Sequence, residues 1–325
     1  MTETTLTARA GTPEAPGAPG APGSVGRRTS RARWMRRARR HGPVWVPWLF
    51  LAPALILFLL FKFIPMGQAL VMSFQDVQPF LGNQWVGTAN YETLVGSPDF
   101  QSAVWHTSIL AVGQTAGSMF LGFTLALLLE GQAKRLWFVR SAAFLPVVAP
   151  MAVIAEVWRI MYHPTSDGLA NQIIGWVTLD PSQWINSPDT SLWSVMIVGI
   201  WRGAPYDMII IVAGLVSVDR SLYEAAALDG AGILQRIRYV TIPALRPVIV
   251  ILLTLAAIRG MRVFTEVYLL TNGGPNGSSE VVMTLIYKLG FERGDLGVAA
   301  AGSVVLFVAT VLLTLLVQFA RRRDR

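Results

Sequence analysis

Six stretches of mostly apolar residues follow one another along the chain, separated by shorter polar segments. Each is close to the ~20 residues that an α-helix needs to cross ~30 Å of hydrocarbon. The stretches run roughly over 46–72, 104–130, 138–162, 191–216, 246–270 and 298–320. The pattern therefore predicts an all-α polytopic membrane protein with six transmembrane helices.

Proline and glycine lie inside two of these stretches. Pro53 and Pro65 fall in the first stretch, and Gly199, Gly203 and Pro205 fall in the fourth. Within a membrane, such residues are tolerated where neighbouring helices or a water-filled cavity satisfy the freed backbone groups. We therefore expect interrupted helices in these two stretches.

Composition supports a membrane protein and excludes several kinds of chemistry. Of the 325 residues, 53% are hydrophobic and only 14% are charged, whereas a soluble domain carries about 25% charged residues. The absence of cysteine excludes a disulfide, a thiolate metal site and a cysteine nucleophile. The 3 histidines are spread along the chain, so the sequence predicts neither a metal site nor a catalytic set.

Lysine and arginine are concentrated in alternate loops. The loops at 73–103 and 163–190 contain acidic residues but no lysine or arginine. Basic residues gather instead near both termini and after the second and fourth stretches: 27–40, Lys134, Arg135, Arg140, Arg220, Arg236, Arg238, Arg246 and 321–325. Because cytoplasmic loops are enriched in these residues, we expect a multi-pass protein of the cell membrane with both termini in the cytoplasm.

This distribution accounts for the net charge of +8 without a nucleic-acid partner. Residues 1–43 combine a run of alanine, proline and glycine with the arginine cluster, and such a composition cannot bury enough apolar surface to fold. We expect a disordered basic cytoplasmic tail over 1–43 and a short basic tail over 321–325. The arginine cluster sets topology or, alternatively, contacts anionic membrane lipid.

The loop between the fourth and fifth stretches has the pattern of a helix, a tight turn and a second helix. Ser221 and Glu224 have the spacing of a capping box, which would start the first helix. Gly230 is placed to end that helix in a left-handed conformation. Pro243 and Pro247 are expected to stop the second helix and set the angle into the fifth span. The loop is predicted to form a rigid helical knob with a small, alanine-lined face, or simply an ordinary capped surface helix.

This loop resembles the "EAA" signature of binding-protein-dependent ABC importer permeases. The matching residues are Glu224, Ala225, Ala226, Asp229, Gly230, Ala231, Ile237, Val240, Pro243 and Pro247. Ile237 and Val240 stand where the carbohydrate-type pattern usually has Phe and Ile. In that family the loop is the coupling helix that docks in a groove of the ATPase. The resemblance implies that Glu224, Ala225, Ala226, Asp229, Gly230, Ala231 and Pro243 take part in this coupling.

Other segments resemble the carbohydrate branch of the same family. Residues 86–91 look like its "GLxNY" element, residues 271–275 fit its "T-x-GGP" turn, and Arg140, Pro146, Trp158 and 168–171 fit its third span and exit. The resemblance implies a type I ABC importer permease fold related to maltose or glycerol-phosphate permeases. It divides the chain into a first transmembrane helix and outer loop over 44–103 and a permease domain over 104–320, with the coupling loop at 217–247.

The resemblance also implies partners. The chain has no G-x-x-x-x-G-K-[ST] loop, so ATP and magnesium would be bound by a separate cytoplasmic ATPase dimer and no cofactor is expected here. A second permease subunit and an extracytoplasmic substrate-binding protein complete the assembly. The alternatives are a polyol importer of the same family and an ion-coupled secondary transporter. The latter would need acidic residues in its spans, where Glu266 is almost the only one that we recognise.

Ionisable residues within spans are functional candidates because they are costly in a membrane. Substrate contacts are predicted for residues of the fourth and fifth stretches and for one aromatic residue of the third: Arg202, Gly203, Tyr206, Arg259, Gly260 and Trp158. Structural roles are the alternative. Arg262 and Glu266 could pair on one helix face, Arg259 could hold a carbonyl or a partner subunit's carboxylate, and Trp158 could serve in packing.

Overall fold

A computed structural model of the chain describes residues 45–78, 82–129, 137–177 and 180–323. The predicted tail at 1–43 lies outside these residues, as do Lys134 and Arg135. The chain forms two units that divide between Phe61 and Lys62. The first unit contains α2 (Trp45–Phe58), a helix with no buried side chains. The second unit contains the cavity and loop described below.

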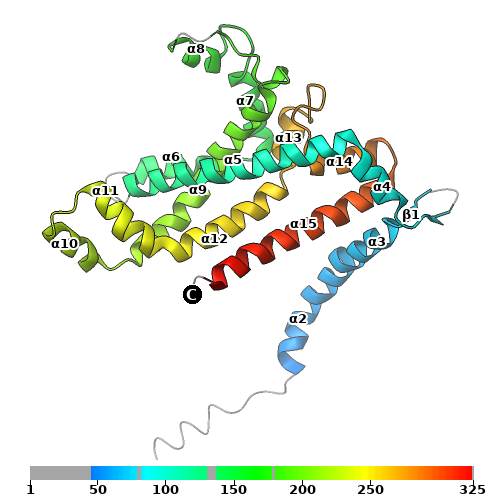
Figure 1. Ribbon diagram of the computed structural model, residues 1–325, viewed down its shortest axis with the longest axis horizontal. Helices are drawn as coiled ribbons and strands as arrows, with labels where there is room; N and C mark the ends of the chain where they lie inside the picture. The colour runs from blue at the N-terminus through cyan, green and yellow to red at the C-terminus, as the bar shows by residue number, and fades with distance from the viewer. Residues whose placement is uncertain (1–44, 79–81, 130–136, 178–179, 324–325) are drawn as a thin grey trace, which may run out of the picture. The chain divides into compact units, whose positions relative to one another are not determined.

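The described part of the chain is mainly helical (Figure 1). The remaining α-helices are α3 (Ile64–Met72), α4 (Ala89–Gly96), α5 (Pro98–Leu129), α6 (Trp137–Val148), α7 (Met151–Met161), α8 (Leu169–Gly175), α9 (Ser191–Val216), α10 (Arg220–Leu228), α11 (Ile233–Arg236), α12 (Ile242–Met261), α13 (Thr265–Leu270), α14 (Val282–Tyr287) and α15 (Leu296–Arg323). Three π-helical segments (Leu59–Phe63, Ile237–Thr241, Lys288–Glu292) and a 3₁₀ turn (Trp184–Asn186) join them. Strands β1 (Gln75–Asp76) and β2 (Gln84–Trp85) pair antiparallel, with Gln75 opposite Trp85.

Five helical runs in the described residues are long and apolar enough to cross a membrane: Trp45–Met72, Pro98–Leu129, Ser191–Val216, Ile233–Met261 and Leu296–Phe319. A sixth candidate is a bent pair, Ser141–Val148 and Met151–Met161, whose axes differ by 109°. The predicted span over 138–162 thus corresponds to this bent pair and not to one continuous helix. Pro150 explains the bend, because it has extended backbone angles (φ −59°, ψ 137°) and lacks the N–H that a continuing helix needs.

Proline and glycine do not interrupt the first and fourth stretches, contrary to the prediction. Residues 45–72 are helical throughout, with a π-helical segment just before Pro65. Helix α9 continues through Gly203 and Pro205. A Cβ at Gly203 would lie 3.0 Å from the Cβ of Ser118. The glycine thus serves close packing of α9 against α5.

The fifth span also differs from its predicted bounds of 246–270. The helical run begins at Ile233 and ends at Met261, and α13 is a separate helix after a short break. Pro243 lies at the start of α12 and Pro247 lies inside it, so neither residue stops a helix. The π-helical segment Ile237–Thr241 has wider turns than an α-helix and precedes Pro243. Such a segment accommodates the hydrogen bond that is lost because proline has no N–H.

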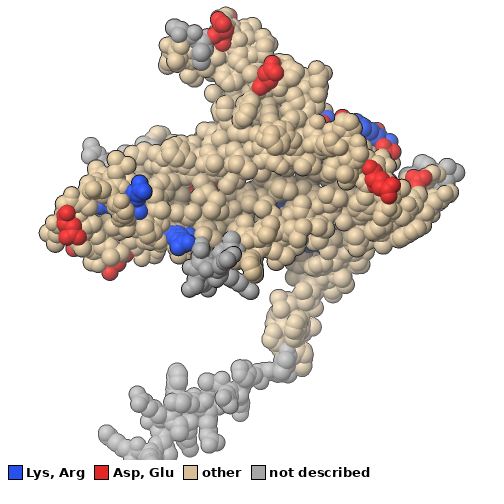
Figure 2. All heavy atoms as spheres, in the orientation of Figure 1, with Lys and Arg blue, Asp and Glu red and all other residues tan. Residues whose placement is uncertain are grey.

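Helices α5, α9 and α12 pack together in the second unit (Figure 1). Small residues allow close approach: a Cβ at Gly122 would lie 2.7 Å from the carbonyl oxygen of Ala204, and one at Gly260 would lie 2.6 Å from the Cα of Ala111. Such contacts are typical of helices that associate within a membrane. On the face drawn in Figure 2, charged residues gather near α8, near α10 and α11, and near α14 and β1, leaving a nearly uncharged surface between them.

Candidate functional site

Helix α10 starts the predicted knob and is capped by Asp219. The Asp219 carboxylate accepts a hydrogen bond from the backbone N–H of Ser221 at 2.9 Å. The predicted Ser221–Glu224 capping box is therefore wrong, because the helix already begins at Arg220 and Ser221 lies in its first turn. The backbone and side-chain hydrogen bonds from Ser221 lower the pKa of Asp219. This cap is thus present at neutral pH and is lost as the pH falls through that lowered pKa.

The turn after α10 has the predicted left-handed glycine. Gly230 has φ +76°, and the N–H of Ala231 donates to the carbonyl of Ala226 at 2.9 Å. This pairing is the Schellman arrangement that satisfies carbonyls at a helix end. The side chain of Gln235 accepts from the N–H of Gly232 at 2.8 Å and so caps α11. Local hydrogen bonds therefore fix the path of the whole loop.

The knob exposes apolar side chains as well as alanine. Leu228, Ile233 and Leu234 are 90%, 77% and 83% exposed. Glu224 and Ala225 are also exposed. Apolar side chains gathered on an exposed and rigid segment are typical of a protein-binding surface. We call residues 219–236 the knob from here on.

A cavity of about 570 Å³ lies among α5, α9, α12 and α13. This volume falls in the range of small-molecule sites, ~300–1,000 Å³. The structure brings five of the predicted substrate residues to its wall: Arg202, Gly203, Tyr206, Arg259 and Gly260. The sixth, Trp158, does not line the cavity. Its ring packs against Tyr162 and Trp201, with centroids 5.0 and 5.6 Å apart, which favours the packing role.

Two ion pairs cross between helices at the cavity wall. Arg202 donates to Glu266 at 2.9 Å, and Arg259 donates to Asp207 at 2.7 Å. The alternative that Arg262 pairs with Glu266 is therefore wrong, because α12 ends before Arg262 and the two residues do not share a helix face. Arg259 finds a carboxylate within its own chain, that of Asp207.

Asp207 is a buried acid that was not among the predicted site residues. Its side chain has no exposed surface and accepts hydrogen bonds from Ser118 and Arg259, each at 2.7 Å. The guanidinium of Arg259 also lies 4.9 Å from the centroid of the Tyr206 ring. In the sequence, Asp207 is recognisable as the one carboxylate within the apolar stretch at 191–216. In the described residues, Asp207 thus lies within the span α9 and Glu156 within the sixth candidate span, while Glu266 lies in α13 after the fifth span.

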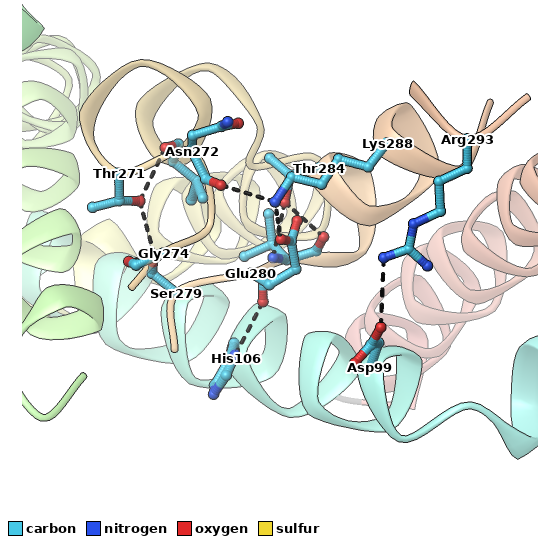
Figure 3. Close-up of polar contacts among 12 residues, drawn as sticks. Asp99, His106, Thr271, Asn272, Gly274, Ser279, Glu280, Thr284, Lys288 and Arg293 are labelled. Atoms are coloured by element: carbon cyan, nitrogen blue, oxygen red, sulfur yellow. Dashed lines mark hydrogen bonds and ion pairs between the residues drawn. The ribbon is translucent and has the colours of Figure 1, made fainter. Parts of the chain in front are cut away.

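A polar cluster fixes the turn at 271–280 against α5 and α14 (Figure 3). Lys288 pairs with the Glu280 carboxylate and donates to the carbonyl of Asn272 at 2.9 Å. A His106 ring nitrogen lies 3.0 Å from the carbonyl of Glu280. Gly273 has φ +78°, and a Cβ there would lie 2.3 Å from the Glu280 carboxylate. This turn therefore requires glycine, as its resemblance to the "T-x-GGP" element implies.

A helical membrane chain with a polar cavity among its spans and a rigid exposed knob has the features of a membrane transport subunit. The chain belongs to the family of binding-protein-dependent transport system inner membrane components, whose profile matches residues 118–325. The predicted family is therefore confirmed, and the chain is a permease component with an inner-membrane location.

Individual relatives cover most of the chain. The probable ABC transporter permease protein YurN of Bacillus subtilis is 34% identical over 276 residues, 83% of this chain and 94% of YurN. The trehalose/maltose transport system permease protein MalF of Thermococcus litoralis is 29% identical over 269 residues, 82% of this chain and 90% of MalF.

A solved structure confirms the fold. A chain from a bacterial ABC transporter involved in the import of the acidic polysaccharide alginate has a TM-score of 0.76 and 26% identity. The match covers 90% of this chain and 99% of that chain. The predicted helical fold of an importer permease is therefore correct.

Proposed function

We propose that this chain is the permease subunit of an ATP-driven importer that carries a sugar or oligosaccharide into the cytoplasm. The observation that carries the proposal is the cavity, where guanidinium and amide donors lie beside the ring of Tyr206. A sugar has apolar ring faces and hydroxyl edges, so aromatic faces and planar donors suit it. The names of relatives that transport maltose and alginate support the same class of substrate.

The knob is proposed to dock on a cytoplasmic ATPase dimer, which binds ATP and magnesium. Its contacts would come from Glu224, Ala225, Ala226, Asp229, Gly230 and Ala231, with Pro243 in the helix behind them. This assignment places both termini in the cytoplasm, in agreement with the arginine-rich loops. Stiffness of the knob matters, because a rigid element transmits movement to the spans that it joins, α9 and α12.

The proposed transport cycle needs two further partners. A second permease subunit would complete the pathway, and an extracytoplasmic binding protein would deliver the sugar to the side opposite the knob. Closure of the ATPase dimer would bring two knobs together, and the spans would rock between inward- and outward-facing states. ATP binding and docking of the binding protein would then be reciprocally coupled.

The Tyr206→Ala variant is expected to lower uptake about tenfold when the binding protein is saturating, because one ring contact is worth roughly 1.4 kcal/mol. The relative rates for two different sugars should also change, while ATPase binding stays intact. Radiolabelled uptake in proteoliposomes and co-purification of the ATPase measure the two effects.

The Tyr206→Phe variant is the matched control, since it keeps the ring above Arg259 and removes only the hydroxyl. It should retain most of the uptake. Unchanged rates and an unchanged sugar preference in Tyr206→Ala would remove this residue from the substrate site.

A further inference from the structure

More positively charged than negatively charged residues line the cavity. Three guanidinium groups line it, those of Arg202, Arg259 and Arg262, but Glu266 is the only carboxylate among its lining residues. Asp207 lies behind the wall, fully buried, and reaches the cavity only through its contact with Arg259. Three cations against two carboxylates leave one formal positive charge at this site.

The ion pairs identify the arginine that carries this excess charge. Glu266 is paired with Arg202 and Asp207 with Arg259, each within 3 Å. Arg262 has no carboxylate within ion-pair distance among the residues that the structure describes, and its side chain is exposed to the cavity. Arg262 follows the end of the fifth span and is exposed, so its charge is open to an anionic ligand in the cavity.

The backbone of Arg262 is anchored at the end of α12. Arg262 is the residue directly after α12, and its backbone N–H donates to the carbonyl of Arg259 at 3.1 Å. The side chain therefore starts from the break between α12 and α13, at the same wall as the two ion pairs. A guanidinium can donate two parallel hydrogen bonds to a planar or tetrahedral anion.

Two further donors at the wall are unused. The Nε of Arg202 and the Nε2 of Gln114 are buried and donate no hydrogen bond within the described part of the chain. Both residues line the cavity. Buried donors are normally satisfied, and sugar hydroxyls are suitable acceptors for them. The cavity thus combines donors for hydroxyl groups with a cation that needs an anionic partner.

We propose that the transported substrate is an anionic saccharide, a sugar that carries a carboxylate, sulfonate or phosphate group, and that Arg262 binds this group. The inference rests on the proposed function and narrows its substrate class. The ion pairs at Arg202 and Arg259 leave those residues to contact hydroxyls, and Arg262 distinguishes the acidic sugar from its neutral counterpart.

The test measures binding to the whole transporter complex in lipid nanodiscs by ligand-observed NMR. The probes are glucose and three relatives that differ at the sixth carbon: glucuronate, glucose 6-phosphate and glucose 6-sulfonate. At least one anionic sugar is expected to bind about tenfold more tightly than glucose, which corresponds to one charge-assisted hydrogen bond. In the Arg262→Gln variant, the ratio of the affinity for that anionic sugar to the affinity for glucose should fall to about one.

The Arg293→Gln variant is the control, because Arg293 is an exposed arginine that lies 3.7 Å from Asp99 outside the cavity. It should keep the preference. Equal binding of glucose and all three anionic sugars would overturn the inference and leave the proposed sugar import intact. If neither glucose nor any anionic sugar binds, both this inference and the proposed sugar import would be overturned.

Two other results would also contradict the inference. Inorganic phosphate that binds as tightly as glucose 6-phosphate would show a site for a free anion instead of a saccharide. Dissociation of the Arg262→Gln complex into single subunits on gel filtration would show that a partner subunit's carboxylate neutralises Arg262.

Discussion

Replacing Glu224 with lysine, or Gly230 with proline, is expected to abolish ATP-driven uptake while the chain remains in the membrane. Glu224 is exposed on α10, so its replacement changes the proposed docking surface and not the packing. Gly230 has φ +76°, whereas proline is fixed near −65°. The proline variant would therefore change the angle between α10 and α11. Uptake assays and immunoblots of the membrane fraction measure the two quantities.

The charge-reversal control is Glu92→Lys, which changes an exposed glutamate on α4, far from the knob along the chain. It should keep near-normal uptake. The milder Gly230→Ala variant should show a partial loss, since alanine in a left-handed conformation costs roughly 1–2 kcal/mol. Full transport by both the Glu224→Lys and Gly230→Pro variants would refute the assignment of the knob.

Replacing Asp207 with alanine is expected to destabilise the protein by about 3 kcal/mol, because it leaves a buried ion pair without one partner. Arg259 would lose its carboxylate and Ser118 would lose its acceptor. The Arg259 side chain is 40% exposed, which places the expected cost at the lower end for such pairs. Denaturant unfolding in detergent micelles measures the change.

The double variant Asp207→Leu with Arg259→Met should recover much of this stability, since it removes both charges together. Asp189→Ala is the control because Asp189 is exposed, and its effect should stay within about 0.5 kcal/mol. An Asp207→Ala protein as stable as the unchanged one would show that the pair does not hold α9 to α12.

The sequence predicted those features that depend on neighbouring residues. Apolar stretches of sufficient length gave the approximate positions of the spans, and the position of Gly230 gave the turn after α10. The choice of Ser221 over Asp219 as the cap was wrong, because both residue types favour this position. Which of the two residues caps the helix depends on where the helix begins. A sequence pattern locates the ends of a helix only to within one or two residues.

Features that depend on contacts between helices were not predictable in this way. The ion pairs Arg202–Glu266 and Arg259–Asp207 join residues 64 and 52 positions apart, and no local pattern links them. The helix break before α13 was likewise missed, because the apolar character continues across it. Arg262 therefore seemed to share a helix face with Glu266, whereas it lines the cavity without an ion pair to a described carboxylate.

In the proposed mechanism, the knob receives force from an ATPase made by another polypeptide. Because the chain has no cysteine, an Ala227→Cys variant introduces a single thiol on the exposed surface of α10. Thiol-specific cross-linking in native membranes should capture a product that contains this chain and the ATPase, and its yield should change with ATP. A cross-linked product that never contains an ATPase, under conditions where the thiol reacts, would contradict the claim.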